Sequence, residues 1–442
     1  MNTVNTANTS STAAATETAE STDATGAAEP SGGAPGGVSR RRLLSTAGAA
    51  GAAGLALGAA GGAGAHAAAA DPAPAALASV GAGTVAFHGG RQPGITTATQ
   101  SHGHLIAFDL APGAGRKEAA ALMRRWSALA AELMAGRPGG PGDTGVALDA
   151  GPSSLTVTFG FGRTFFGRTG LSARRPAGLD PLPAFSADRL DARRSEGDLW
   201  VQIGADDGLV AFHALRAIQR SAGDAARVRW QMNGFNRSPG ATARPMTTRN
   251  LMGQVDGTNN PKPSDEDFDR RIFVPSGGEH SWLAGGSYAV VRRIRMLLDD
   301  WEGLTRAKQE AVIGRRKSDG APLTGGGETT ALALDRLDAD GRPVIAANAH
   351  ARISAPEQNG GAAMLRRPFS YHDGIDSDGT PDAGLLFICW QADPLRGFVP
   401  VQRKLDRGDA LSPFLRHEAS GLFAVPGGAR EGEYVGQRLL ES

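Results

Sequence analysis

The chain has 442 residues, with 46 basic and 45 acidic side chains and a formal net charge of +1. This balance excludes a protein that binds nucleic acid through bulk positive charge. The single cysteine, Cys389, excludes an intramolecular disulfide and any paired-cysteine metal site.

The N-terminal 70 residues differ from the rest of the chain. Residues 1–38 are rich in Ala, Thr, Ser and Gly, a composition that predicts disorder. The segment SRRRLL then begins at Ser39 and leads into an apolar run without a charged side chain, which carries a small-x-small cleavage site at residues 65–67. This pattern resembles a twin-arginine signal peptide, and its few leucines among many glycines disfavour the alternative of a membrane span. We expect export through the twin-arginine machinery to the periplasm, the cell envelope or the exterior, often with a cofactor already bound.

The first half of the mature chain alternates strands and helices. The apolar run at residues 104–110 and the alternating pattern at 154–161 predict strands, and so does the segment 198–205. Residues 116–135 predict a helix, because Leu122, Trp126, Leu129 and Leu133 share one face. A second helix is predicted at residues 208–219.

The second half repeats this order. Strands are predicted at residues 287–297, 349–353 and 384–390, and a helix at 301–313. Residues 397–405 and 413–417 are read as helical, whereas 268–283 and 317–329 are read as loops. A β-α-β and β-α order that occurs twice predicts an α+β protein of two ferredoxin-like domains packed together, in the manner of a dimeric α+β barrel. After the N-terminal region at 1–70, we place the first domain at 71–240 and the second at 241–442.

Three polar motifs are candidates for reactive sites. Asp256 lies in the glycine-flanked segment NLMGQVDGTNNP, which starts at Asn250, and an ordinary Asp-Gly turn is the simpler alternative. His350 lies between two alanines, which leave room for a planar ligand, but for this segment alone a core or surface histidine is the favoured interpretation. In the pair Arg366-Arg367 one side chain must face inward on any strand, where a buried guanidinium needs an anionic partner such as a structural carboxylate.

Together these motifs resemble the dye-decolourising peroxidase family of haem proteins. The Gly-x-x-Asp-Gly element appears at residues 253–257, and the segment at 313–323 resembles the glycine-arginine stretch near the haem propionates. Residues 384–398 match the family's closing strand. The segment RQPGI, which starts at Arg91, departs from the usual pattern, because the family's segment normally starts with His. The resemblance covers roughly residues 84–440 and is similar to the exported bacterial branch, which includes iron-uptake members.

The resemblance implies one haem b per chain, held in the C-terminal domain. His350 would be the axial iron ligand, with His372 as the next histidine to test, and Asp393 the acceptor that holds its second ring nitrogen. Asp256 would move a proton of the peroxide, Arg366 would stabilise the developing negative charge, and Arg315 would pair with a propionate. Trp390 and Tyr371 are candidate electron relays, although core packing explains any single aromatic residue equally well.

The function implied is a haem peroxidase that uses hydrogen peroxide to oxidise dyes, phenols or other organic donors. Two alternatives remain open: a deferrochelatase that releases iron from haem and leaves the porphyrin intact, and a haem protein of metal trafficking. The sequence predicts no nucleic-acid partner, and it leaves open whether the chain forms a homo-oligomer.

Overall fold

The computed structural model describes residues 79–442 apart from 141 and 244–245. These residues belong to one compact unit, which spans Pro74–Ser442. The N-terminal segment predicted to be disordered and the twin-arginine signal lie outside the described residues. No helix in the described part of the chain combines the length and apolar character that a membrane span requires.

The strands are β1 (His102–Leu110), β2 (Thr156–Gly162), β3 (Leu199–Ala205), β4 (Ala226–Phe235), β5 (Ser287–Met296), β6 (Leu365–Arg366), β7 (Phe369–Ile375), β8 (Pro381–Gln391) and β9 (Leu415–Val425). The α-helices are α2 (Ser79–Ala82), α3 (Arg116–Met134), α4 (Arg163–Arg168), α5 (Gly208–Ala222), α6 (Phe268–Ile272), α7 (Leu298–Glu302), α8 (Arg306–Ile313), α9 (His350–Ile353), α10 (Phe398–Gly408) and α11 (Gln437–Leu440). Short 3₁₀ helices are η1 (Ser172–Arg174), η2 (Ala177–Leu179), η3 (Ala192–Arg194), η4 (Ser281–Leu283), η5 (Pro356–Asn359) and η6 (Ser412–Phe414).

The nine strands form one sheet in the order β5-β9-β2-β3-β1-β4-β7-β8-β6, and a further pairing of β5 with β8 closes it into a barrel. All ladders between these strands are antiparallel. The strands of the first half lie in the order β4-β1-β3-β2. Those of the second half lie in the order β9-β5-β8-β7, in which β9, β5, β8 and β7 take the places of β4, β1, β3 and β2. Each half therefore has the ferredoxin-like arrangement, which confirms the predicted fold class.

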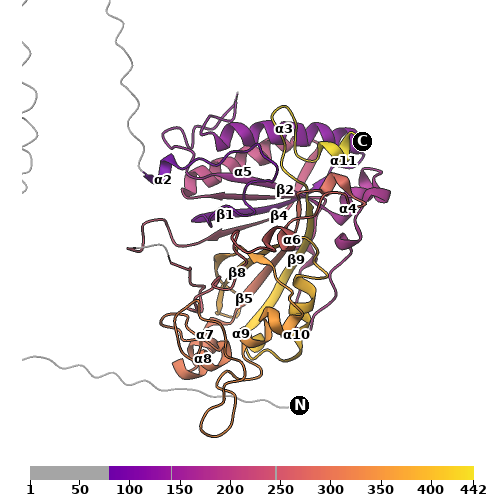
Figure 1. Cartoon of the computed structure of the whole chain (residues 1–442). Coiled ribbons are helices and arrows are strands. Elements are labelled where there is room, and N and C mark those ends of the chain that lie inside the picture. The colour runs from indigo at the N-terminus through magenta and orange to yellow at the C-terminus, as the bar shows by residue number, and fades with distance from the viewer. Residues whose placement is uncertain (1–78, 141, 244–245) are drawn as a thin grey trace, which may run out of the picture. The chain divides into compact units, whose positions relative to one another are not determined.

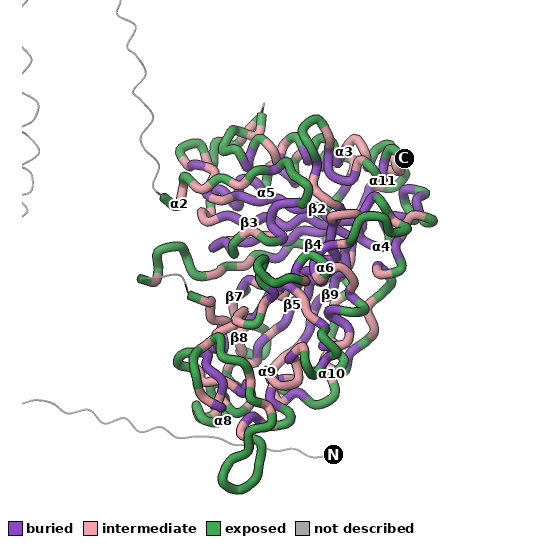
Figure 2. Tube along the Cα trace, in the orientation of Figure 1, coloured by how far each residue is buried: buried purple, intermediate pink, exposed green. Residues whose placement is uncertain are grey.

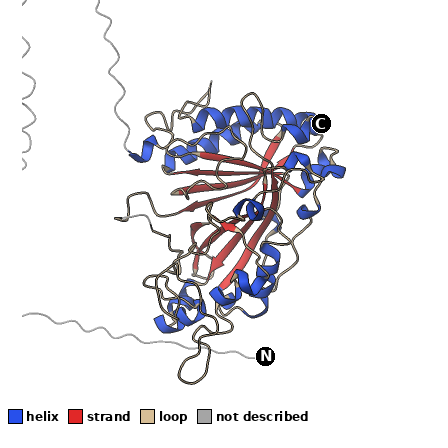
Figure 3. Ribbon diagram, in the orientation of Figure 1, coloured by secondary structure: helices blue, strands red, loops and turns tan. Residues whose placement is uncertain are grey.

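The ladders that join the two halves of the sheet are short. Between β2 and β9 the ladder has two residue pairs, and between β4 and β7 it has one, Phe235 with Ser370. Figure 3 shows these two groups of strands as parts of one continuous sheet. Backbone hydrogen bonds outside the ladders, such as those from the Arg189 amide to the His417 carbonyl at 2.8 Å and from the Glu196 amide to the Ser420 carbonyl at 2.9 Å, also join the halves, together with side-chain packing inside the barrel. The predicted boundary at residue 240 stays a prediction.

The core has an inner and an outer part. Inside the barrel, Trp200 lies stacked on Phe423 with ring centroids 5.3 Å apart and tilted against Trp390 at 5.9 Å. Outside it, α3 and α5 lie side by side over the strands of the first half (Figure 1), and Trp126 of α3 packs on Phe159 of β2. The strands β1, β2 and β3 are buried along most of their length, while the outward faces of these helices are exposed (Figure 2).

Several predicted elements need correction. The segment at 349–353 was predicted as a strand but forms the helical turn α9, because alternating small residues carry no clear period. Residues 413–417 were read as helical but hold only the end of η6 and the start of β9. The helix predicted at 301–313 is divided into α7 and α8, since Thr305 caps a new helix through its side chain on the Lys308 amide. The strands β4, β7 and β9 were not predicted, and the loop at 268–283 contains α6 and η4.

Candidate active site

Two of the predicted reactive residues form a direct ion pair. Asp256 lies in the loop between β4 and α6, and Arg366 ends the short strand β6, 110 residues further along the chain. Arg366 Nη1 donates to Asp256 Oδ1 at 2.6 Å. Both side chains keep some solvent exposure, 29% for Arg366 and 17% for Asp256. A paired acid and base are thus held together where a small molecule can reach them.

The backbone of the Asp256 loop is fixed by local contacts. Gly253 has φ +76° and Gly257 has φ +124°, values that favour glycine, so the chain turns sharply on both sides of the aspartate. The Asp256 amide donates to the Thr248 carbonyl at 2.9 Å, and Asn250 Nδ2 donates to Asp256 Oδ2 at 3.3 Å. The sequence reading of a tight polar turn is therefore correct, and the turn aims its carboxylate at Arg366.

Asn260 holds the other partner, a role that the sequence reading missed. Its Nδ2 donates to the Arg366 carbonyl at 2.7 Å, and its Oδ1 accepts from the Arg366 amide at 3.1 Å. The side-chain amide therefore binds Arg366 in the way a neighbouring strand would. The segment that carries Asp256 thus also fixes the backbone of Arg366, which sets the relative position of the two charges.

The charges in the site act against one another on the pKa of Asp256. Burial alone would raise the pKa, but the charge of Arg366 and the hydrogen bond from the Asn250 amide favour the ionised carboxylate more strongly. A positive charge on His350 acts in the same direction. The net result is a pKa below the ordinary value for aspartate. Asp256 therefore stays an ionised base in mildly acidic solution.

His350 is the first residue of α9, and its Nδ1 lies 2.7 Å from Oδ2 of Asp409. Because a carboxylate accepts, Nδ1 carries a proton, and in the neutral ring Nε2 then keeps a free lone pair. The Asp409 side chain is 2% exposed, whereas His350 is 30% exposed. Burial lowers the pKa of His350, but Asp409 more than offsets this, and the pKa lies above its ordinary value.

The prediction that Asp393 holds His350 is wrong. Asp393 precedes α10 and accepts instead from the Leu395 amide at 2.8 Å, while Asp409 is the C-cap residue at the other end of the same helix. Asp409 Oδ1 also accepts from the Leu411 amide at 3.0 Å, which fixes the carboxylate. No motif surrounds Asp409 in the sequence, so only the packing of α9 against α10 identifies it.

Arg315 follows Gly314, which ends α8 in the left-handed region with φ +88°. Its Nη1 donates to the carbonyls of Gly320 and Glu328 at 2.8 and 2.9 Å, and it forms no ion pair with any described carboxylate. The half-buried guanidinium therefore keeps its Nε and Nη2 donors for an anionic group. The pairing of Arg315 with a propionate stays a prediction.

Arg367, and not Arg366, is the inward arginine of its pair. It is 4% exposed and donates to neutral oxygens only, namely the carbonyls of Gly94 and Ala98 and Oε1 of Gln100. The sequence analysis expected an anionic partner, and that expectation is wrong. Burial lowers the pKa of Arg367 to about 10. This side chain binds the RQPGI segment to the barrel.

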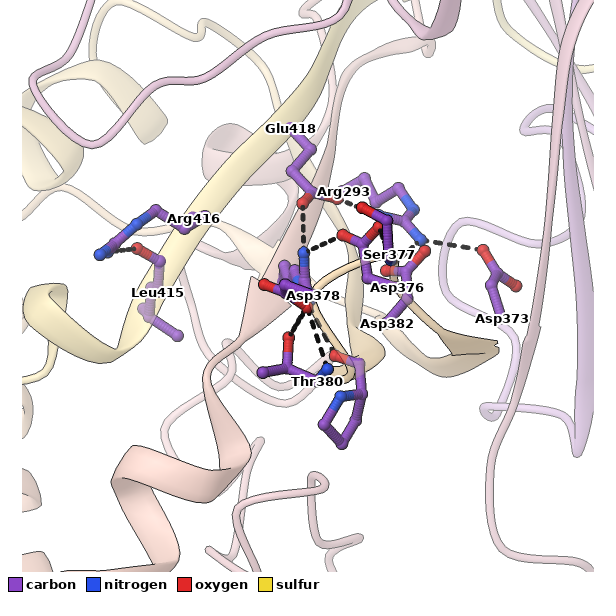
Figure 4. Close-up of polar contacts among 12 residues, drawn as sticks. Arg293, Asp373, Asp376, Ser377, Asp378, Thr380, Asp382, Leu415, Arg416 and Glu418 are labelled. Carbon is purple, nitrogen blue, oxygen red and sulfur yellow. Dashed lines mark hydrogen bonds and ion pairs between the residues drawn. The ribbon is translucent and has the colours of Figure 1, made fainter. Parts of the chain in front are cut away.

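The two candidate electron relays are both buried. Trp390 lies at the barrel centre with 0% exposure, and Tyr371 is 1% exposed under the guanidinium of Arg293, 4.0 Å from the ring centroid. Arg293 also binds the carboxylates of Asp373, Asp382 and Glu418 (Figure 4). Neither aromatic side chain reaches the surface, so neither could by itself receive an electron from a bulky donor in solution.

Comparison with known proteins identifies the family. Two family models match: the N-terminal domain of Dyp-type peroxidases over residues 92–236 and the C-terminal domain over residues 247–430. The chain belongs to the Dyp-type peroxidase family. Both models lie within the range where the sequence analysis placed the resemblance to this family.

Individual proteins that are similar to this chain agree with the family assignment. A dye-decolorizing peroxidase from Thermobifida fusca is 46% identical over 360 residues, which cover 79% of this chain and 84% of the relative. A deferrochelatase from Escherichia coli K12 is 33% identical over 370 residues, 80% of this chain and 86% of the relative. The crystal structure of a DyP-type peroxidase from Streptomyces coelicolor superposes with a TM-score of 0.81 at 75% identity and covers 82% of this chain and 99% of the other. Ferric DtpA from Streptomyces lividans gives the same values.

Proposed function

We propose that this protein is a haem-dependent peroxidase that uses hydrogen peroxide to oxidise dyes, phenols or other organic donors. The observation that carries the proposal is the pairing of Asp256 with Arg366 at 2.6 Å, in electrostatic reach of a histidine that a second carboxylate orients. The family, the relative at 46% identity and the ferric state named for DtpA support a haem at this place.

The donor set fits one haem b. His350 offers Nε2 to the iron, and the Asp409 carboxylate on Nδ1 fixes the tautomer and raises the basicity of the ring. Arg315 has free donors for a propionate. A haem bound there would supply the redox chemistry. Every other function falls to the side chains that face it.

Asp256 and Arg366 divide the work on the peroxide. Peroxide cleavage needs one oxygen to lose a proton and the other to gain one, and an ionised Asp256 can accept and return that proton. Arg366 stabilises the negative charge that develops on the leaving oxygen, and it keeps its own charge at every working pH. The ion pair between them keeps the carboxylate ionised between turnovers.

The test uses the purified full chain and haem. We expect an intense haem absorption band after addition of one equivalent, and peroxide-dependent oxidation of a phenol. His350→Ala should lose the band while its far-ultraviolet circular dichroism stays that of a folded protein. An unchanged band in this variant would show that another residue binds the iron, and His372 would be tested next.

A deferrochelatase is the second candidate, because relatives named so are 33–34% identical over 80% of this chain. The same pocket would then release iron and leave the porphyrin intact. Haem incubated with the protein should give metal-free protoporphyrin, which is recognised by its fluorescence, only under this alternative. The reading as a haem protein of metal trafficking predicts neither product nor peroxide turnover.

We also propose export by the twin-arginine route, on the evidence of the SRRRLL segment and the apolar run that follows it. The machinery reads a pair of guanidinium groups, so replacement of both Arg40 and Arg41 by Lys should keep the unprocessed protein in the cytoplasm. Both must be changed, because Arg42 could pair with Arg41. Normal export of this double variant would indicate the general secretory route instead.

A further inference from the structure

A cavity lies beside Asp409, the carboxylate partner of His350. It has a volume of about 340 Å³ and is formed by the loop between η2 and η3, the end of α10, η6 and the start of β9. Asp409 is part of its wall, and the same carboxylate accepts from His350. A molecule in this cavity therefore lies one side chain away from the predicted iron ligand.

The wall of the cavity carries three guanidinium groups: Arg189, Arg407 and Arg416. None of them forms an ion pair with a carboxylate among the described residues. Arg189 donates to the carbonyls of Ser186 and Asp188, and Arg416 donates to those of Pro413 and Leu415. Figure 4 shows Arg416 bonded to Leu415 and separate from the acidic cluster around Arg293. The three positive charges are thus not neutralised within the described fold.

The cavity also holds two carboxylates, and hydrogen bonds occupy both. Asp406 Oδ1 accepts from the amide and the hydroxyl of Ser186, each at 2.6 Å. Asp409 accepts from His350 and from the Leu411 amide. Three cations therefore face two carboxylates that are already bonded, so the cavity favours an anion. Arginine suits a carboxylate or a sulfonate, because its fork of N–H groups can bind two oxygens at once.

We propose that this cavity binds an anionic organic electron donor, such as an aromatic carboxylate or sulfonate. The proposal rests on the peroxidase function proposed above, which supplies the oxidant. A donor that is too large for the peroxide site would be held by its acidic group against Arg189, Arg407 and Arg416, with its ring toward Asp409 and His350. A volume of about 340 Å³ accommodates a substituted single ring.

The reaction balances with phenols as donors. Each phenol loses one electron and its hydroxyl proton and becomes a phenoxyl radical. Two phenols reduce one hydrogen peroxide to two molecules of water, with the two phenolic protons as the protons that the water needs. The cavity takes no part in breaking the O–O bond, so changes in it should leave the reaction with peroxide unaltered.

Binding is tested without turnover. 3,4,5-Trimethoxybenzoate carries the acid but has no oxidisable hydroxyl, and 1,2,3-trimethoxybenzene is its neutral counterpart. Calorimetry on the haem-loaded full chain should detect the benzoate and not the neutral ring. The triple variant Arg189→Gln, Arg407→Gln, Arg416→Gln should weaken this binding by about tenfold or more, because charge-assisted hydrogen bonds are lost. Arg403→Gln, an exposed arginine of α10 outside the cavity, serves as the matched control.

Turnover is tested with a second matched pair, syringate and 2,6-dimethoxyphenol, which differ by one carboxylate. The triple variant should raise KM for syringate by about tenfold and leave kcat, KM for the neutral phenol and the rate with peroxide unchanged. Added salt should raise KM for syringate in the wild type, since these charges are partly exposed. A variant with Arg189→Gln, Arg407→Gln and Arg416→Lys keeps one of the three charges, so its KM for syringate should lie between those of the triple variant and the wild type.

The outcomes separate the two proposals. Equal binding of the benzoate to the wild type and the triple variant, or equal changes in KM for both phenols, would overturn the donor site. Binding that depends on the three arginines in a protein that oxidises neither phenol would retain the anion site and overturn the peroxidase function.

Discussion

At the scale of single residues, the ion pair with Arg366 sets the ionisation of Asp256. The guanidinium stabilises the ionised carboxylate against the effect of burial, so the base is available at lower pH than an isolated buried aspartate would be. Asn250 and Asn260 fix one partner each. The two side chains therefore act as a pair, and replacement of Arg366 changes the pKa of Asp256.

The first prediction concerns the acid itself. Asp256→Asn keeps the shape of the side chain but cannot accept a proton, so the rate constant for reaction with peroxide should fall by about 10²–10⁴-fold. Stopped-flow measurement of the haem spectrum after mixing with peroxide checks this. A wild-type rate would leave Asp256 a role in shaping the pocket only, with Arg366 acting with a water molecule.

The second prediction follows from the coupling. In Arg366→Leu the stabilising charge is lost, so the pKa of Asp256 should rise. Since the base acts when ionised, the acidic limb of the pH–rate profile should move to higher pH, and the loss of rate should be greater at pH 4–5 than at pH 7. A profile that falls by the same factor at all pH values would show that Arg366 acts through charge stabilisation alone.

At the scale of elements, the position of His350 depends on how α8 ends. Gly314 closes α8 in the left-handed region, and a Cβ at this position would lie 3.1 Å from Cγ2 of Ile345 and 3.3 Å from Cβ of Ala349. Ala349 directly precedes His350. The end of α8 thus lies against the segment that carries His350, the predicted iron ligand. Arg315, which directly follows Gly314, is placed close to the same segment.

We predict that Gly314→Ala lowers the free energy of unfolding by about 1–2 kcal/mol, from the left-handed conformation, and weakens haem binding in addition. Gly223→Ala is the control, because Gly223 ends α5 with φ +54° and a Cβ there would contact nothing within 4 Å. Haem titration and urea unfolding of both variants check this. Equal haem affinity in the two variants would show that the end of α8 does not contribute to haem binding.

At the scale of the whole molecule, Arg293 connects the strands of the second half. From β5 it reaches the carboxylates of Asp373 on β7, Asp382 on β8 and Glu418 on β9, and it is itself 1% exposed (Figure 4). Burial raises the pKa of Glu418, and Arg293 opposes this effect. One guanidinium therefore balances three carboxylates at the closure of the barrel.

We predict that Arg293→Met lowers the free energy of unfolding by about 2–4 kcal/mol at pH 7, because Asp373 and Asp382 lose their partner and Glu418 keeps only Arg295, at 3.9 Å. Burial already raises the pKa of Glu418, and loss of Arg293 raises it further in the folded variant, so the deficit should shrink as the pH falls to 5. Urea unfolding at both pH values checks this. Arg137→Met is the control, because Arg137 pairs with the exposed Glu132 outside this cluster. A deficit that is independent of pH would point to lost packing.

The sequence by itself determined much of the local structure and the outline of the site. Strands with apolar runs and the amphipathic helix at 116–135 were predicted close to their observed bounds, because periodicity is a local property. The repeated order of elements was enough to predict two ferredoxin-like units. The glycines around Asp256 marked a special turn, and the resemblance to the family indicated His350 and Arg366.

The tertiary structure decided what depends on contacts between distant segments. Asp409 replaces Asp393 as the partner of His350, because the two ends of α10 differ in position and only packing brings one of them to α9. Arg367, and not Arg366, faces inward, and neutral oxygens surround it. The strand β4 alternates apolar and polar residues from Ala226 to Asn233, a local strand signal that the sequence-based prediction missed. The strands β7 and β9 show no regular period along their length, and their neighbours in the closed sheet specify them. A pattern within the chain cannot encode these choices, since each results from which surfaces meet once the barrel closes.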